Sequence, residues 1–167
     1  MNNKFPIHIS KGRIFSSSQK AFSIQDSKNL GEKSNNKVNY SEFEAFYLFE
    51  TNQAEIIKNK SLSEEKIIRE FSKKHKEFLV KYQVFKALRK NHIVKTGSKF
   101  GAEFRVYDQI ANHAKWLVFP VKQSEKLNLH ELISKTRIAH STAKKLLLAI
   151  VDSENDVLFY EIDWIKI

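Results

Sequence analysis

The N-terminal part of the chain alternates apolar and polar positions over short stretches. Ile7 and Ile9 alternate with polar residues, a Lys11-Gly12 turn signal follows, and apolar residues resume at Ile14 and Phe15, which predicts a β-hairpin. Residues 18–31 have the composition of a short helix that ends near Gly31. Residues 32–37, EKSNNK, contain no apolar side chain, and we expect them to form a loop.

Two serines mark expected helix starts further along the chain. Ser41 is followed three residues later by Glu44, which is the spacing of a capping box, and a Phe-rich apolar run comes next. Ser61 and Glu64 repeat this spacing before the apolar positions of residues 65–71. The two motifs predict two capped helices.

The middle of the chain has the pattern of a connecting helix. Apolar residues share a face in segment 65–71 and again in segment 78–85. The basic run KKHK, residues 73–76, interrupts this apolar stripe. A helix with such a polar middle is typical of a connector between two small cores, so we place a domain boundary near residue 76.

From residue 92 onward the hydrophobic period becomes that of β-strands. Residues 92–108 contain two short extended pieces separated by glycines. In the second piece Phe104 and Val106 point to one face, and Arg105 and Tyr107 point to the other.

The remaining segments predict a β-rich α/β unit with a helix packed on it. Residues 114–121 read as a strand in which Pro120 indicates an edge position or a strand end. Residues 127–140 have helical spacing, and residues 145–152 form the continuous apolar run expected of a strand buried on both faces. After an acidic turn, residues 157–167 form a last strand.

The composition limits the classes of function. The formal charge of +10 at pH 7 suits a polyanionic partner and suits a lysine-rich solvated surface equally well. There are no cysteines, which excludes disulfides and thiolate chemistry. No apolar run reaches the length of a membrane span, and the first residues lack the apolar core of a secretory signal, so we expect no membrane association.

The common catalytic motifs are missing from the sequence. The six histidines show neither HxxxH nor HExxH spacing, which argues against a metal site, and the four glycines form no phosphate loop. No GxSxG motif supports a serine nucleophile. Tyr107, His113 and Lys144 remain as candidates; taken singly, each is explained as well by strand packing, a loop position or a solvated strand start.

Two stretches of the C-terminal half resemble the catalytic domain of tRNA-intron (tRNA-splicing) endonucleases, in particular the archaeal-type catalytic subunit. They are residues 95–107 (KTGSKFGAEFRVY) and residues 137–152 (RIAHSTAKKLLLAIVD), with a histidine before LV between them. The resemblance runs almost continuously over residues 95–164, and more loosely over the N-terminal half. Glu103, Ala143 and a short loop after the FRVY strand depart from the family pattern.

The resemblance implies a fold and an activity. The fold class is α/β (α+β): a small N-terminal α/β domain, residues 1–76, and a C-terminal catalytic endonuclease domain, residues 77–167, with a mixed central sheet flanked by helices. The activity is removal of introns from precursor tRNA by cleavage at bulge-helix-bulge splice sites, without a metal or cofactor, leaving a 2′,3′-cyclic phosphate and a 5′-hydroxyl.

The resemblance also implies roles for the three candidates. Tyr107 is the general base on the ribose 2′-OH, His113 is the general acid for the leaving 5′-oxygen, and Lys144 stabilises the charge on the phosphorane. Histidine titrates near neutral pH and suits the acid role. Tyrosine ionises near pH 10, so a base role requires nearby cations such as Arg105 or Lys144.

Further residues are implied in RNA binding and assembly. Arg137 and Trp164 are expected to sandwich an extruded base of the intron bulge, by cation–π attraction and stacking. The acidic turn (Asp152, Glu154, Asp156) is expected to enter a basic cleft of a neighbouring subunit, in a homotetramer or in a heterotetramer with a related structural subunit. The terminal strand is a pairing edge for such assembly. The lysines expected near phosphates are Lys95, Lys99, Lys115 and Lys145.

Two other functions stay open at this point. One is a non-catalytic structural subunit that binds RNA within the same assembly. The other is a generic basic RNA-binding domain, which leaves the spacing of the three candidates unexplained. A compact chain of this kind is expected in the cytoplasm.

Overall fold

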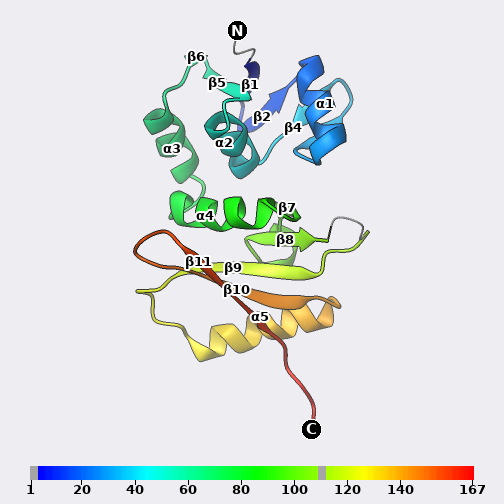
Figure 1. Ribbon diagram of the computed structural model, residues 1–167, viewed down its shortest axis with the longest axis vertical. Helices are drawn as coiled ribbons and strands as arrows, with labels where there is room; N and C mark the ends of the chain where they lie inside the picture. Colours follow the sequence, from blue (N-terminus) through cyan, green and yellow to red (C-terminus); the bar gives the residue numbers. More distant parts are fainter. Residues whose placement is uncertain (1–3, 109–111) are drawn as a thin grey trace. The chain divides into compact units, whose positions relative to one another are not determined.

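The computed structural model describes residues 4–108 and 112–167 and divides into two compact units, Met1–Phe78 and Leu79–Ile167 (Figure 1). Each unit is built on its own β-sheet. None of the helices in the described ranges has the length and apolar character needed to cross a bilayer.

The N-terminal unit contains a six-stranded sheet in the order β3-β4-β2-β1-β5-β6. Its strands are β1 (Phe5–Ser10), β2 (Arg13–Ser16), β3 (Glu32–Ser34), β4 (Lys37–Asn39), β5 (Ala54–Lys58) and β6 (Lys60–Ser61). The predicted first hairpin is confirmed, because β1 and β2 pair antiparallel across the Lys11-Gly12 turn. The loop expected at residues 32–37 is wrong. This segment forms the β3–β4 hairpin, held by main-chain pairing rather than by buried side chains, and Asn35 takes a positive φ of 53° at its turn.

Three helices belong to this unit: α1 (Gln19–Lys28), α2 (Glu42–Glu50) and α3 (Glu64–Ser72). The capping box at Ser41 is confirmed: its hydroxyl accepts the Glu44 backbone N–H, and the Glu44 carboxylate accepts the Ser41 backbone N–H at 3.0 Å. The second capping box is wrong. Ser61 lies in β6, and α3 begins after Ser63, whose side chain makes no capping bond.

The single connecting helix expected over residues 65–85 is also wrong, because the chain forms two helices there. α3 ends at Ser72 and α4 (Phe78–Arg89) starts after a break that contains the basic run. Glu77 has a positive φ of 57°, which a continuous α-helix does not allow. The polar run that interrupts the apolar stripe therefore marks the end of a helix rather than its middle.

The C-terminal unit contains a five-stranded mixed sheet in the order β11-β10-β9-β8-β7. Its elements are β7 (Ile93–Thr96), the 3₁₀ turn η1 (Ser98–Phe100), β8 (Phe104–Tyr107), β9 (Trp116–Lys122), α5 (Leu129–Ser141), β10 (Lys145–Val151) and β11 (Val157–Ile162). β9 and β10 are parallel, and the other neighbours are antiparallel. The mixed sheet and the α/β fold class are as the sequence predicted.

Helices cover both faces of this sheet. α5 lies along one face, where Leu117, Leu146 and Leu148 pack with Ala139 of the helix (Figure 1). On the other face the Phe85 ring of α4 lies 5.8 Å from the Phe104 ring.

One predicted possibility, that Pro120 lies on an edge strand, is wrong. β9 is a central strand, and Pro120 lies opposite Ala149 of β10. On the other side of β9 the pairing with β8 ends at Val118. The missing N–H of Pro120 therefore removes no bond from the β8–β9 ladder.

Candidate active site at one end of the sheet

The register of three strands brings Tyr107 and Lys144 to the same end of the sheet. Trp116, the first residue of β9, lies opposite Val106 of β8 and opposite Lys145 of β10. The backbone N–H of Lys115 donates to the Val106 carbonyl at 2.8 Å, and that of Lys145 donates to the Lys115 carbonyl at 2.9 Å. Tyr107 and Lys144 thus lie two strand spacings apart, about 10 Å between backbones.

Tyr107 and Lys144 also share a face of the sheet. Arg105 lies opposite Leu117, a core residue under α5, and Tyr107 follows two positions later on the same face. The Lys144 ammonium lies 4.9 Å from the centroid of the Phe100 ring, and Phe100 packs against this same core. The two side chains therefore lie on the α5 side, each of them half-buried.

The immediate surroundings of these side chains are cationic and aromatic. The Arg105 guanidinium lies 5.8 Å from the centroid of the Tyr107 ring. Lys144 donates a hydrogen bond from Nζ to the Thr142 carbonyl at 2.8 Å, which holds the ammonium close to the backbone that leads into β10. This tether limits how far the charge of Lys144 can move.

His113 lies three residues before β9 and is exposed. It therefore belongs to the segment that enters the same end of the sheet as Tyr107 and Lys144. The short loop that follows the FRVY strand includes residues 109–111, which lie outside the described residues.

A polar network occupies the opposite face of this sheet end. The Trp116 indole N–H donates to Glu161 Oε2 at 2.7 Å, and Lys145 Nζ contacts Glu161 Oε1 at 2.5 Å. Hydrogen bonds from Lys145 and then Trp116 lower the pKa of Glu161. Asp108 faces Lys115 Nζ at 3.7 Å. Two of the lysines expected near phosphates, Lys115 and Lys145, are thus paired with carboxylates.

Arg137 and Trp164 line one pocket of about 600 Å³. Arg137 is exposed on α5, and Trp164 follows the end of β11. The other lining residues are Leu132, Ile133, Thr136, His140, Ile162 and Asp163. The structure therefore brings together the two residues that the sequence predicted to hold a base.

The acidic turn lies at the other end of the sheet. It follows β10, so it is separated from Lys144 by the length of that strand, about 20 Å. Asp152 Oδ1 accepts the backbone N–H groups of Glu154 and Asp156 at 2.8 and 2.9 Å, so this carboxylate holds the turn in shape. The carboxylates of Glu154 and Asp156 are exposed.

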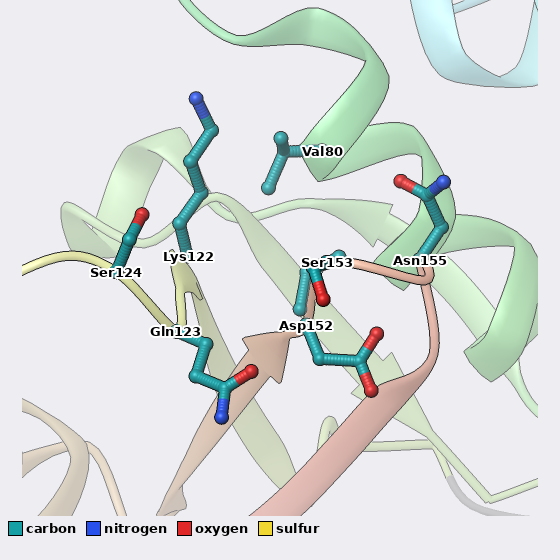
Figure 2. A pocket seen from close by; sticks show the side chains of 8 residues that line it. Val80, Lys122, Gln123, Ser124, Asp152, Ser153 and Asn155 are labelled. Atoms are coloured by element: carbon teal, nitrogen blue, oxygen red, sulfur yellow. The ribbon is translucent and has the colours of Figure 1, made fainter.

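A pocket of about 410 Å³ adjoins the acidic turn (Figure 2). Lys122, Gln123 and Ser124 come from the end of β9, and Val80 comes from α4. Figure 2 shows Lys122 and Val80 on one side and Gln123 and Asp152 on the other. The candidate active site thus lies where the parallel strands β9 and β10 begin, and the acidic turn and this pocket lie where they end.

Two residues near the candidate site were missed in the sequence. The sequence pattern gives Phe100 no special role, yet its ring lies beside Lys144. His140 lines the pocket of Arg137 and Trp164. Its position three residues after Arg137 on the same helix face was a signal that helical periodicity supplies.

Comparison with known proteins identifies the family. Residues 78–159 match the catalytic C-terminal domain of the tRNA intron endonucleases. The tRNA-splicing endonuclease of Pyrococcus abyssi is 36% identical over 169 residues, covering 99% of both chains. That of Thermococcus kodakarensis is 34% identical, with 95% of this chain and 97% of the relative covered, and that of Nanoarchaeum equitans is 38% identical over 74% and 86%. The chain belongs to the tRNA-intron endonuclease family and carries the catalytic domain of that family.

Proposed function

We propose that this chain removes introns from precursor tRNA by metal-independent cleavage at bulge-helix-bulge splice sites, leaving a 2′,3′-cyclic phosphate and a 5′-hydroxyl. The observation that carries the proposal is the shared end and shared face of Tyr107 and Lys144, with His113 entering that end, inside a domain of this family. The three archaeal relatives named above are tRNA-splicing endonucleases.

Each of the three residues has a role that fits its chemistry. In the proposed step the Tyr107 phenolate takes the proton of the ribose 2′-OH and becomes the phenol, and the 2′-oxygen attacks the adjacent phosphorus. The bond from phosphorus to the 5′-oxygen breaks, and His113 gives its proton to that leaving oxygen. The Lys144 ammonium stabilises the charge that builds on the non-bridging oxygens. The Arg105 guanidinium lies beside this base, 5.8 Å from the centroid of the Tyr107 ring.

The pocket of Arg137 and Trp164 binds an unpaired base of the substrate in this proposal. Its residues come from the part of α5 and the end of β11 that lie near the start of β10. An unpaired bulge base presents two flat faces and no competing base-pair partner, and RNA-binding proteins commonly recognise such bases by stacking.

Two active sites are needed to cut at two bulges, so assembly is part of the proposed function. The exposed carboxylates of Glu154 and Asp156 project from the turn beyond β10. β11 is an edge strand of its sheet, and its large side chains Leu158, Phe159 and Tyr160 are exposed. These two surfaces are proposed to join copies of this chain, or this chain and a related structural subunit. The expected cytoplasmic location stays a prediction.

The experiment uses purified chain and a bulge-helix-bulge RNA in excess EDTA. The proposal expects two cuts, with 2′,3′-cyclic phosphate on each upstream product and 5′-hydroxyl on each downstream product. A fully paired RNA of the same length is the matched control and stays intact. Binding without cleavage, even with a related subunit supplied, would contradict the proposal and support a non-catalytic subunit.

A further inference from the structure

His140 lines the pocket of Arg137 and Trp164, and the proposed stacking of a base between those two residues gives His140 no role. The centroid of its imidazole lies 4.6 Å from that of the Trp164 ring, with the planes inclined by 49°. Its Nδ1 lies 3.9 Å from Oδ1 of Asp163, which lines the same pocket. Two aromatic rings, of His140 and Trp164, and the carboxylate of Asp163 therefore line the same pocket.

This pocket lies at the same end of the sheet as Lys144. Leu146 of β10 lies opposite Ile162 of β11, so Asp163 and Trp164 continue beyond the same end of the sheet as Lys144. His140 is four residues before Lys144, in the last turn of α5.

We propose that His140 and Asp163 are specificity-determining residues that select which unpaired base enters this pocket. His140 extends the aromatic surface of Trp164, and the Asp163 carboxylate accepts a hydrogen bond from an amino group of the base. The inference rests on the proposed function, because it assumes an RNA substrate with unpaired bases.

The chemistry of the pocket favours a base over the other parts of an RNA chain. Its apolar walls include Leu132, Ile133 and Ile162, which suit a flat ring, and the planar guanidinium of Arg137 can stack on such a ring. The Asp163 carboxylate repels a phosphate and accepts hydrogen bonds from an exocyclic amino group. A volume of about 600 Å³ is within the range of pockets that hold small organic groups.

The test of His140 pairs a protein change with a substrate change. A bulge-helix-bulge RNA is compared with the same RNA carrying an abasic site at the bulge base, and kcat/KM is measured in EDTA for both. The wild-type protein is expected to prefer the intact RNA, and His140→Ala to lower this preference about tenfold, the typical effect of losing one stacking partner. His140→Phe, which keeps a flat ring, is expected to restore it.

The matched control is His130→Ala, which changes another exposed histidine of α5 that does not line the pocket. It is expected to leave the preference unchanged. A loss of activity in His140→Ala that is equal on intact and abasic RNA would overturn the role of His140, because a purely structural defect does not depend on the bulge base.

The test of Asp163 compares adenine at the bulge position with unsubstituted purine, which lacks the amino group. At low substrate concentration the wild-type protein is expected to cleave the adenine substrate about tenfold faster, because purine lacks the amino group that donates a hydrogen bond to the Asp163 carboxylate. Asp163→Ala is expected to remove this difference. An unchanged adenine preference in the variant would overturn the role of Asp163.

These outcomes separate the inference from the proposed function. If the wild-type protein cuts neither RNA, the proposed function fails and the inference fails with it. If the wild-type protein cuts the intact RNA, and the His140→Ala and Asp163→Ala variants keep its preference for the bulge base, only the inference fails.

Discussion

Trp116 lies opposite Lys145 at the first residue of the parallel β9–β10 pair. This register fixes where Lys144 leaves the sheet: one residue earlier, at the end where β8 delivers Tyr107. Lys144 and Lys145 are adjacent in sequence but differ in their partners. Lys144 lies against Phe100 on the α5 face, and Lys145 pairs with Glu161 on the other face.

The first prediction separates these two lysines. Lys144→Ala is expected to lower the single-turnover cleavage rate by roughly 10²–10³-fold, the typical cost of removing one donor to a transition-state oxyanion. Lys145→Ala, the matched control, removes an exposed ion pair and is expected to change the rate only a few-fold. The measurement is the cleavage rate at saturating enzyme, with circular dichroism to verify folding. Equal losses in the two variants would contradict the assignment of Lys144.

A second prediction concerns the acidic turn. Glu154→Gln with Asp156→Asn removes two exposed charges, and we expect higher assemblies to dissociate with little change in Tm. Asp152→Ala removes the acceptor of two backbone N–H groups and is expected to cost about 1 kcal/mol of stability. Light scattering gives the mass, and thermal unfolding gives the Tm. An unchanged mass for the double variant would refute the role of these two charges in assembly.

The third prediction is a pH dependence of folding stability in the N-terminal unit. Burial acts to raise the pKa of Glu42, but hydrogen bonds from His75 and Lys74 outweigh it and hold the pKa at about 2. A carboxylate whose folded pKa is depressed contributes stability above its ordinary value near 4.5, and this contribution is lost as the pH falls towards 2. Glu42→Gln is therefore expected to lose less stability than the wild-type protein over this interval.

The measurement is the free energy of unfolding at several pH values between about 5 and 2. Glu64→Gln serves as the control, because Glu64 is exposed at the start of α3. It is expected to follow the wild-type curve. A Glu42→Gln curve parallel to the wild-type curve would show that the contacts of Glu42 with His75 and Lys74 do not shift its titration.

The C-terminal sheet was predictable because its sequence obeys strong local rules. The continuous apolar run at 146–151 is too long to be buried on one face only, and the alternation of Phe104 and Val106 with Arg105 and Tyr107 fixes which face each residue takes. The β3–β4 hairpin was missed for the opposite reason. All side chains of β3 are exposed and Val38 of β4 is buried, so this hairpin carries only a weak hydrophobic signal and is formed mainly by main-chain pairing.

The site was predictable in part. Residue types and the family pattern singled out Tyr107, His113 and Lys144, but sequence spacing does not reveal that β9 and β10 are parallel and start side by side. The contact of Lys144 with Phe100 depends on how η1 folds back onto the core, and the His140–Trp164 contact depends on where β11 ends. Both are tertiary relationships between segments far apart in the chain.

The most direct test of the central claim, that this sheet end performs general acid–base cleavage of RNA, replaces the leaving 5′-oxygen by sulfur. A thiolate leaves without a proton, so it does not need a general acid. His113→Ala is expected to cut ordinary bulge-helix-bulge RNA at least about 10²-fold more slowly than the wild-type protein, and to recover near wild-type rate on the sulfur-substituted RNA. Tyr107→Phe is expected to remain slow on both. If His113→Ala is as slow on the sulfur-substituted RNA as on the ordinary RNA, His113 is not the general acid, and the account of this site is wrong.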